Sequence, residues 1–102
     1  MEKIFKQIGF AYRAQSVVLG TDKIIQLSKK GKINLVIMSI KTSNNTQKLI
    51  QDKLSDTAIP IVIVDDYDNE ELSKSLGKEN VKVVAIKDKG FSNNILKTIR
   101  GE

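Results

Sequence analysis

The chain has 102 residues, a formal net charge of +5, and neither cysteine nor histidine. This composition excludes disulfides, thiolate zinc sites and nucleophilic catalysis that needs a Ser-His or Cys-His pair. Apolar residues make up 40% of the chain, which indicates a folded protein rather than a disordered one. The length suits one ordinary domain, and we expect a single domain over 1–102.

The charge is unevenly distributed along the chain. Residues 1–54 carry ten basic and three acidic side chains, whereas residues 55–102 carry seven and nine. A one-sided positive field suits a polyanionic partner. However, 15 of the 17 basic residues are lysine, a bias that genome composition alone can produce. Charge by itself therefore leaves RNA binding and a compositional bias as equal alternatives.

The first half of the chain predicts alternating helices and strands. The predicted elements are a helix over 2–14, a strand over 16–19, a helix over 21–30, a strand over 33–39 and a helix over 43–54. Thr21 is the predicted N-cap of the second helix, and Gly31 has the C′ role at its end. For the third helix the predicted cap is Thr42 or Ser43. The strand over 33–39 is apolar on both faces, as in a sheet that is covered on both sides.

The second half continues the alternation. Pro60 marks the entry to a strand over 61–64. Asp68 and Glu71 have capping-box spacing, which predicts a short helix that ends at Gly77. A strand over 81–86 follows, and apolar residues every four positions from Phe91 predict a closing helix. Alternating strands and helices predict a layered α/β sandwich, with a purely parallel and a mixed sheet both open.

Gly20–Lys23 is the segment most informative about function. It directly follows the apolar run over 17–19, so it corresponds to a strand, a glycine turn and the start of a helix. Such a start presents free backbone N–H groups and the positive end of the helix dipole. Both favour phosphate or a nucleic-acid backbone. The lysines grouped around it, Lys23, Lys29, Lys30 and Lys32, favour RNA over a small substrate.

Two other polar segments allow a functional and a structural interpretation. Asp65, Asp66 and Asp68 follow the third strand, where paired carboxylates can hold Mg²⁺. We prefer helix capping and solvation for them, because no acceptor aspartate follows the second strand. The segment from Ser39 to Thr46 offers hydrogen bonds to ribose and phosphate, but helix capping explains it equally well.

Other features argue for a protein without cofactor, metal or membrane contact. The sequence contains neither a Gly-x-x-x-x-Gly-Lys-Ser/Thr loop nor a Gly-x-Gly-x-x-Gly turn, so no nucleotide cradle is recognisable. Its start lacks a long apolar segment, and no stretch approaches 18 apolar residues. We therefore expect a cytoplasmic monomer with no DNA partner.

Several motifs occur in an ordered series over nearly the whole chain. They are Gly9–Ala14, Val17–Gly20, Ser43–Thr46, Leu76–Glu79 and Val83–Phe91. This series resembles the YlxQ-like bacterial members of the kink-turn-binding ribosomal protein family of L-seven-Ae and L-thirty-e type. The resemblance implies a three-layer α/β/α sandwich with a four-stranded mixed sheet, no catalysis, and a structured RNA partner such as ribosomal RNA.

The same resemblance implies where RNA contacts the chain. The family grips RNA with the helix after the first strand, through a Gly-x-Asn-Glu-x-x-x-Lys motif. Gly20 matches it, whereas Asp22, Lys23 and Gln26 stand at or near the usual Asn, Glu and Lys. Two further contacts are the loop before the last strand and the segment after the second strand. The predicted RNA-binding residues are Gly20, Thr21, Asp22, Lys23, Gln26, Lys29, Lys30, Lys41, Lys78, Glu79 and Asn80.

These departures from the family motif keep a second function open. In the loop before the last strand only Glu79 is retained, between Lys78 and Asn80, and its apolar neighbours are lost. Apolar packing on a splayed base is worth about 1–3 kcal/mol at single-stranded sites. A protein-interaction module that kept the fold and lost specific RNA contacts is therefore the alternative.

Overall fold

The computed structural model describes residues 2–65, 76–77 and 81–101. The elements described are α1 (Glu2–Arg13), β1 (Val17–Leu19), α2 (Thr21–Lys29), β2 (Leu35–Ser39), α3 (Asn44–Lys53), β3 (Ile61–Val64), β4 (Val83–Ile86) and α5 (Lys89–Ile99). The predicted start of a short helix at Asp68 lies outside the described residues, although its predicted end, Gly77, is described and has φ of +65°. Among the described helices, none is long and apolar enough to cross a bilayer.

The four strands form one mixed sheet in the order β1-β4-β2-β3. β2 and β3 are parallel, because α3 carries the chain back between them, with Val36 opposite Ile61. β4 lies between β1 and β2 and is antiparallel to both. The mixed sheet implied by the resemblance is therefore confirmed.

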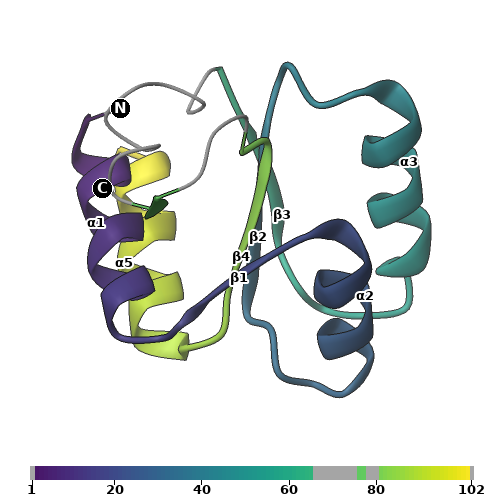
Figure 1. Ribbon diagram of the computed structural model, residues 1–102, viewed down its shortest axis with the longest axis horizontal. Helices are drawn as coiled ribbons and strands as arrows, with labels where there is room; N and C mark the ends of the chain where they lie inside the picture. The colour runs from purple at the N-terminus through teal and green to yellow at the C-terminus, as the bar shows by residue number, and fades with distance from the viewer. Residues whose placement is uncertain (1, 66–75, 78–80, 102) are drawn as a thin grey trace.

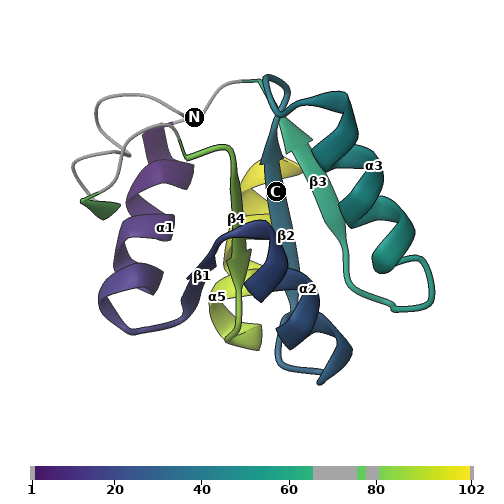
Figure 2. The ribbon, with the colours of Figure 1, turned by 45° about the vertical axis from the view of Figure 1, so that its right-hand side comes forward.

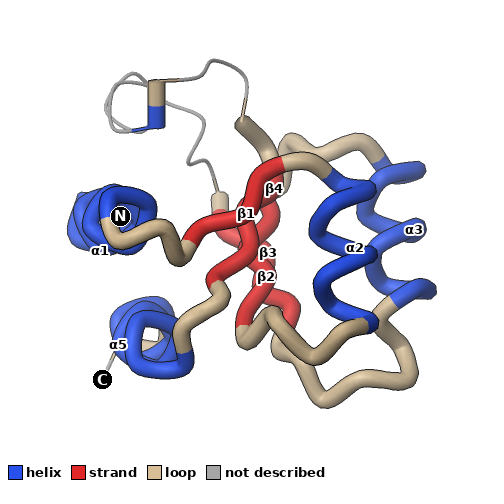
Figure 3. The backbone as a smooth tube through the Cα atoms, turned by 60° about the horizontal axis from the view of Figure 1, so that its bottom comes forward, coloured by secondary structure: helices blue, strands red, loops and turns tan. Residues whose placement is uncertain are grey.

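Helices cover both faces of this sheet. Figure 3 shows α1 and α5 on one face and α2 and α3 on the other, which gives the expected α/β/α layers. Along β2 the side chains alternate between the two cores: Leu35 and Ile37 pack towards α1 and α5, and Val36 and Met38 pack towards α2 and α3. All five residues of β2 are buried, as its continuous apolar pattern predicts.

α2 ends in a complete Schellman motif. Gly31 has φ of +72°, a left-handed conformation that favours glycine. Its N–H donates to the Ser28 carbonyl at 3.1 Å, and the Lys32 N–H donates to the Leu27 carbonyl at 3.0 Å. The C′ role predicted for Gly31 is confirmed, and two terminal carbonyls of α2 are satisfied by the chain itself.

The strand directions place the connecting segments at two opposite ends of the sheet. β1, β2 and β3 all finish at one end, where β4 begins, and we call this end the carboxyl end. Figures 1 and 2 show β2 and β3 running towards it and β4 running away from it. The segments after β1, β2 and β3 therefore share one end of the molecule. The α1–β1 turn, the loop after α2 and the residues after β4 share the opposite end.

Candidate nucleic-acid interface

Gly20 is the N-cap of α2, and it makes no side-chain capping hydrogen bond. Gly20 occupies the N-cap position with φ of 94° and ψ of 124°, and its carbonyl accepts the first helical hydrogen bond from the Ile24 N–H at 2.9 Å. The prediction that Thr21 caps this helix is wrong. The positive φ of Gly20 makes the turn from strand to helix, so Thr21 already lies inside the helix and its hydroxyl cannot take the N-cap position.

The backbone N–H groups in the first turn of α2 therefore lack an acceptor among the described residues. Within the described part of the chain, no group accepts a hydrogen bond from the N–H of Thr21, Asp22 or Lys23. Asp22 and Lys23 are exposed and Thr21 is half-buried. Uncapped amides together with the positive end of a nine-residue helix dipole make this turn suitable for a phosphate or another anion.

The other two described helices that follow a strand or loop have side-chain caps. Ser43 Oγ accepts from the Thr46 N–H at 3.2 Å at the start of α3. Asp88 Oδ1 accepts from the Phe91 N–H at 3.0 Å at the start of α5. One of the two predicted caps of α3, Ser43, is thus confirmed. Asn44 and Asn45, in the first turn of α3, remain exposed.

The fold brings one group of the predicted RNA-binding residues to the carboxyl end of the sheet. Gly20–Lys23 follow β1 there, and the exposed Lys41 follows β2, with its N–H bonded to Ser39 Oγ at 3.1 Å. Lys78, Glu79 and Asn80 lie outside the described residues. The chain re-enters the described part beside β2, because the Ser39 N–H donates to the Lys82 carbonyl at 2.8 Å.

Other predicted residues lie elsewhere. Lys29 and Lys30 are exposed at the far end of α2, about 13 Å from its start at 1.5 Å per residue. Gln26 is exposed between them and the first turn. Asp65 is exposed after β3, whereas Asp66 and Asp68 lie outside the described residues. No cluster of three potential metal ligands occurs among the residues that the structure describes.

The sequence motifs did not single out a basic surface beside β1. Arg13 and Lys87 are 74 positions apart in the chain, yet both line one hollow of about 540 Å³ together with Lys23. The available signal was weak: Arg13 stands inside the first family-like motif and Lys87 inside the last, but neither had been assigned a role. Only the pairing of β1 with β4 brings them together.

Comparison with known proteins identifies the family. The model of the ribosomal protein L7Ae/L30e/S12e/Gadd45 family matches residues 2–96. The chain belongs to this family. It is 35% identical to the RNA-binding protein YlxQ of Bacillus subtilis, over 92 residues that cover 90% of each chain. It is 29% identical to the RNA-binding protein YlxQ of Enterococcus faecium, over 98% of this chain and 94% of that one. Neither name describes an enzyme, in agreement with the expected absence of catalysis.

Solved structures share the fold. A protein of unknown function from Bacillus halodurans superposes with a TM-score of 0.86 at 28% identity, covering 96% of this chain and 97% of that chain. A 15.5 kDa RNA-binding protein from Giardia lamblia superposes with a TM-score of 0.69 at 16% identity, covering 95% and 81%. The second likeness, at so low an identity, concerns the fold alone.

Proposed function

We propose that this protein binds structured RNA without catalysis, and that the start of α2 recognises a kink-turn-like element, as found in ribosomal RNA. The observation that carries the proposal is the open first turn of α2, in a chain whose relatives are named RNA-binding proteins. An uncapped helix start at the family's motif position offers amide donors to RNA phosphates and to base edges. RNA with splayed bases suits such a site, because the deep groove of A-form RNA hides base edges.

In this proposal the predicted residues at the carboxyl end of the sheet have defined tasks. Gly20 lets the backbone approach the RNA closely, and the amides of Thr21 and Lys23 bind phosphate. Lys23 adds positive charge to the same helical turn as the Asp22 carboxylate, which stands where the family motif has an uncharged asparagine. Lys41 adds positive charge at the same end of the sheet, and Lys78–Asn80 complete the interface from the loop before β4.

The test compares two RNAs of equal length, one with a kink-turn and one with the same stem fully paired. Fluorescence anisotropy at several salt concentrations gives the affinity for each and the slope of log K against log salt. The proposal requires a preference for the kink-turn that persists at high salt. Equal affinity for both RNAs, with salt accounting for all binding, would reduce the site to a nonspecific polycation.

The Asp22→Asn variant sharpens this test. Removing one negative charge beside phosphate is expected to raise kink-turn affinity about two- to fivefold, corresponding to the 0.3–1 kcal/mol typical of a charge at a helix start. The same variant is expected to lose a few tenths of a kcal/mol of stability, because an acidic residue favours the positive end of a helix. A kink-turn affinity that does not rise would mean that Asp22 does not face the RNA. Binding partners that survive nuclease treatment would instead favour a protein-interaction module.

A further inference from the structure

Two hollows adjoin along the outer side of β1 and the end of the sheet opposite the carboxyl end. The first, of about 600 Å³, is lined by residues of the α1–β1 turn, by Lys32 and by the segment from Lys87 to Phe91. The second, of about 540 Å³, extends along β1 to α2. Gln15 and Lys87 line both, so the hollows form one continuous surface, which we call the β1 groove.

The β1 groove is strongly basic. Four cations line it: Arg13, Lys23, Lys32 and Lys87. Among the described residues, no carboxylate lies within ion-pair distance of any of these four. Arg13 instead lies over the ring of Phe10, with its guanidinium carbon 4.8 Å from the ring centroid. The groove therefore carries positive charge that the described part of the fold does not neutralise.

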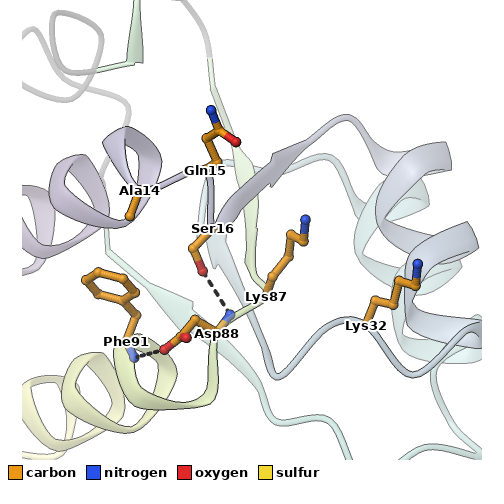
Figure 4. A pocket seen from close by; sticks show the side chains of 7 residues that line it. All are labelled: Ala14, Gln15, Ser16, Lys32, Lys87, Asp88 and Phe91. Carbon is orange, nitrogen blue, oxygen red and sulfur yellow. Dashed lines mark hydrogen bonds between the residues drawn. The ribbon is translucent and has the colours of Figure 1, made fainter.

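Among the described residues that line the groove, one is a carboxylate, Asp88, and it already has a structural partner. Asp88 accepts a hydrogen bond from the Phe91 N–H, and Figure 4 shows its carboxylate turned towards Phe91 and away from Lys87 and Lys32. The Asp88 N–H is bonded to Ser16 Oγ at 2.8 Å, which ties the start of α5 to the start of β1. In the same view Lys87 lies between Gln15 and Lys32, so polar groups follow one another along the groove.

β1 adds backbone donors to this surface. β1 is an edge strand, paired only with β4 in the sheet described. The Lys87 N–H donates to the Ser16 carbonyl at 2.7 Å, which fixes the alternation of the antiparallel ladder. By that alternation Val18 bonds to β4, and the N–H groups of Val17 and Leu19 face the open edge. Backbone N–H groups are common partners of phosphate oxygens.

We propose that the β1 groove binds the sugar-phosphate backbone of the RNA strand that leaves the α2 site. The inference rests on the proposed function, because Lys23 belongs both to the first turn of α2 and to the groove. Four cations, edge amides and an open surface suit a polyanion better than an apolar ligand. β1 has three residues, which gives a peptide strand little to pair with.

The groove's contribution is electrostatic and independent of base sequence. The test replaces its three cations outside the α2 site, in a variant carrying Arg13→Gln, Lys32→Gln and Lys87→Gln. All three side chains are exposed, so the variant is expected to fold. The control carries Lys48→Gln, Lys53→Gln and Lys97→Gln, three exposed lysines outside the groove with the same loss of charge.

The groove variant is expected to bind both kink-turn RNA and the paired stem more weakly, by a factor of up to about ten. The ratio of the two affinities is expected to stay unchanged. The salt dependence becomes weaker: the magnitude of the slope of log K against log salt decreases by about 2–3, since each lost phosphate contact removes about 0.7–0.9. The control changes both quantities much less. Equal losses of RNA affinity in the groove variant and the control would contradict RNA binding by the β1 groove. They would leave the proposed kink-turn recognition by the start of α2 unaffected. If the wild-type protein binds neither RNA, both the proposed function and RNA binding by the β1 groove are contradicted.

Discussion

α2 and α3 start at equivalent places in the fold, but their starts are capped differently. Each follows a strand that ends at the carboxyl end of the sheet. The N-cap of α3 is Ser43, whose hydroxyl accepts from the Thr46 N–H, whereas the N-cap of α2 is Gly20, which has no side-chain acceptor. Among the described residues, the same fold therefore caps one helix start with a side chain and leaves the neighbouring start without a side-chain cap.

The difference is confined to the beginning of α2. Its end is closed by the Schellman motif at Gly31, and α5 is capped by Asp88. Among the described helices that follow a strand or loop, α2 alone combines a satisfied end with an uncapped start. Serine is a common capping residue, but at position 20 it would be strained, because φ there is +94°. Glycine fits this conformation, and its missing side chain leaves the backbone at the start of α2 open.

Gly20→Ala is the change with the largest expected effect on this comparison. The structure has open space around the added methyl group, so the cost comes from the backbone, whose φ of +94° disfavours a side chain. We expect a loss of about 1–3 kcal/mol in the free energy of unfolding, measured by urea denaturation. Kink-turn affinity is also expected to fall, because relief of the strain moves the first amides of α2.

Gly31→Ala is the matched control for this change. It adds a methyl group into open space at the other end of the same helix, at φ of +72°. The expected loss of stability is about 1 kcal/mol, with unchanged RNA affinity at a temperature where the protein is folded. Equal losses of RNA affinity in the two variants would show that the affinity depends on the stability of α2 as a whole rather than on the conformation of its start.

Ser43→Ala tests the capped start, with Thr21→Ala as its counterpart. Loss of the Ser43 cap is expected to cost about 1 kcal/mol of unfolding free energy, with kink-turn affinity unchanged. Thr21 makes no cap, so Thr21→Ala is expected to change stability by less than about 0.5 kcal/mol. Thermal unfolding of both variants measures the contrast. A larger loss for Thr21→Ala would mean that Thr21 supports the start of α2 through packing.

Much of the fold was predictable because its signals are local. The apolar run over 33–39 predicted a doubly covered strand, and its central position in the sheet explains why all of β2 is buried. Ser43 and Gly31 carry out the roles that their residue types favour. The choice of a mixed sheet came from the family resemblance, because alternating strands and helices leave the direction of the last strand open.

The parts that were not predictable depend on backbone angles or on distant pairing. Residue type favours Thr21 as a cap, and only the positive φ of Gly20 shifts the helix start by one residue. Lys29 and Lys30 were grouped with Lys23 because they are close in sequence, although α2 holds them at its other end. Arg13 and Lys87 share a hollow because β1 pairs with β4, which no local pattern specifies.

Asp88→Asn gives the smallest expected effect and separates capping from charge. Asparagine caps a helix about as well as aspartate, so the bond to the Phe91 N–H persists and stability changes by less than about 0.5 kcal/mol. The β1 groove loses its one described carboxylate. Affinity for both the kink-turn RNA and the paired stem is therefore expected to rise about two- to fivefold at low salt, an effect of up to about 1 kcal/mol.

Asp52→Asn is the control for this last change, since Asp52 is exposed on α3 and lies outside the groove. Both variants raise the net charge by one, so a long-range effect of charge alone appears equally in both. A rise confined to Asp88→Asn locates the RNA backbone beside β1. Equal rises would attribute the gain to net charge and contradict the groove. Because Asp88 is a cap that asparagine can replace, the result reports on the charge of the groove without opening the start of α5.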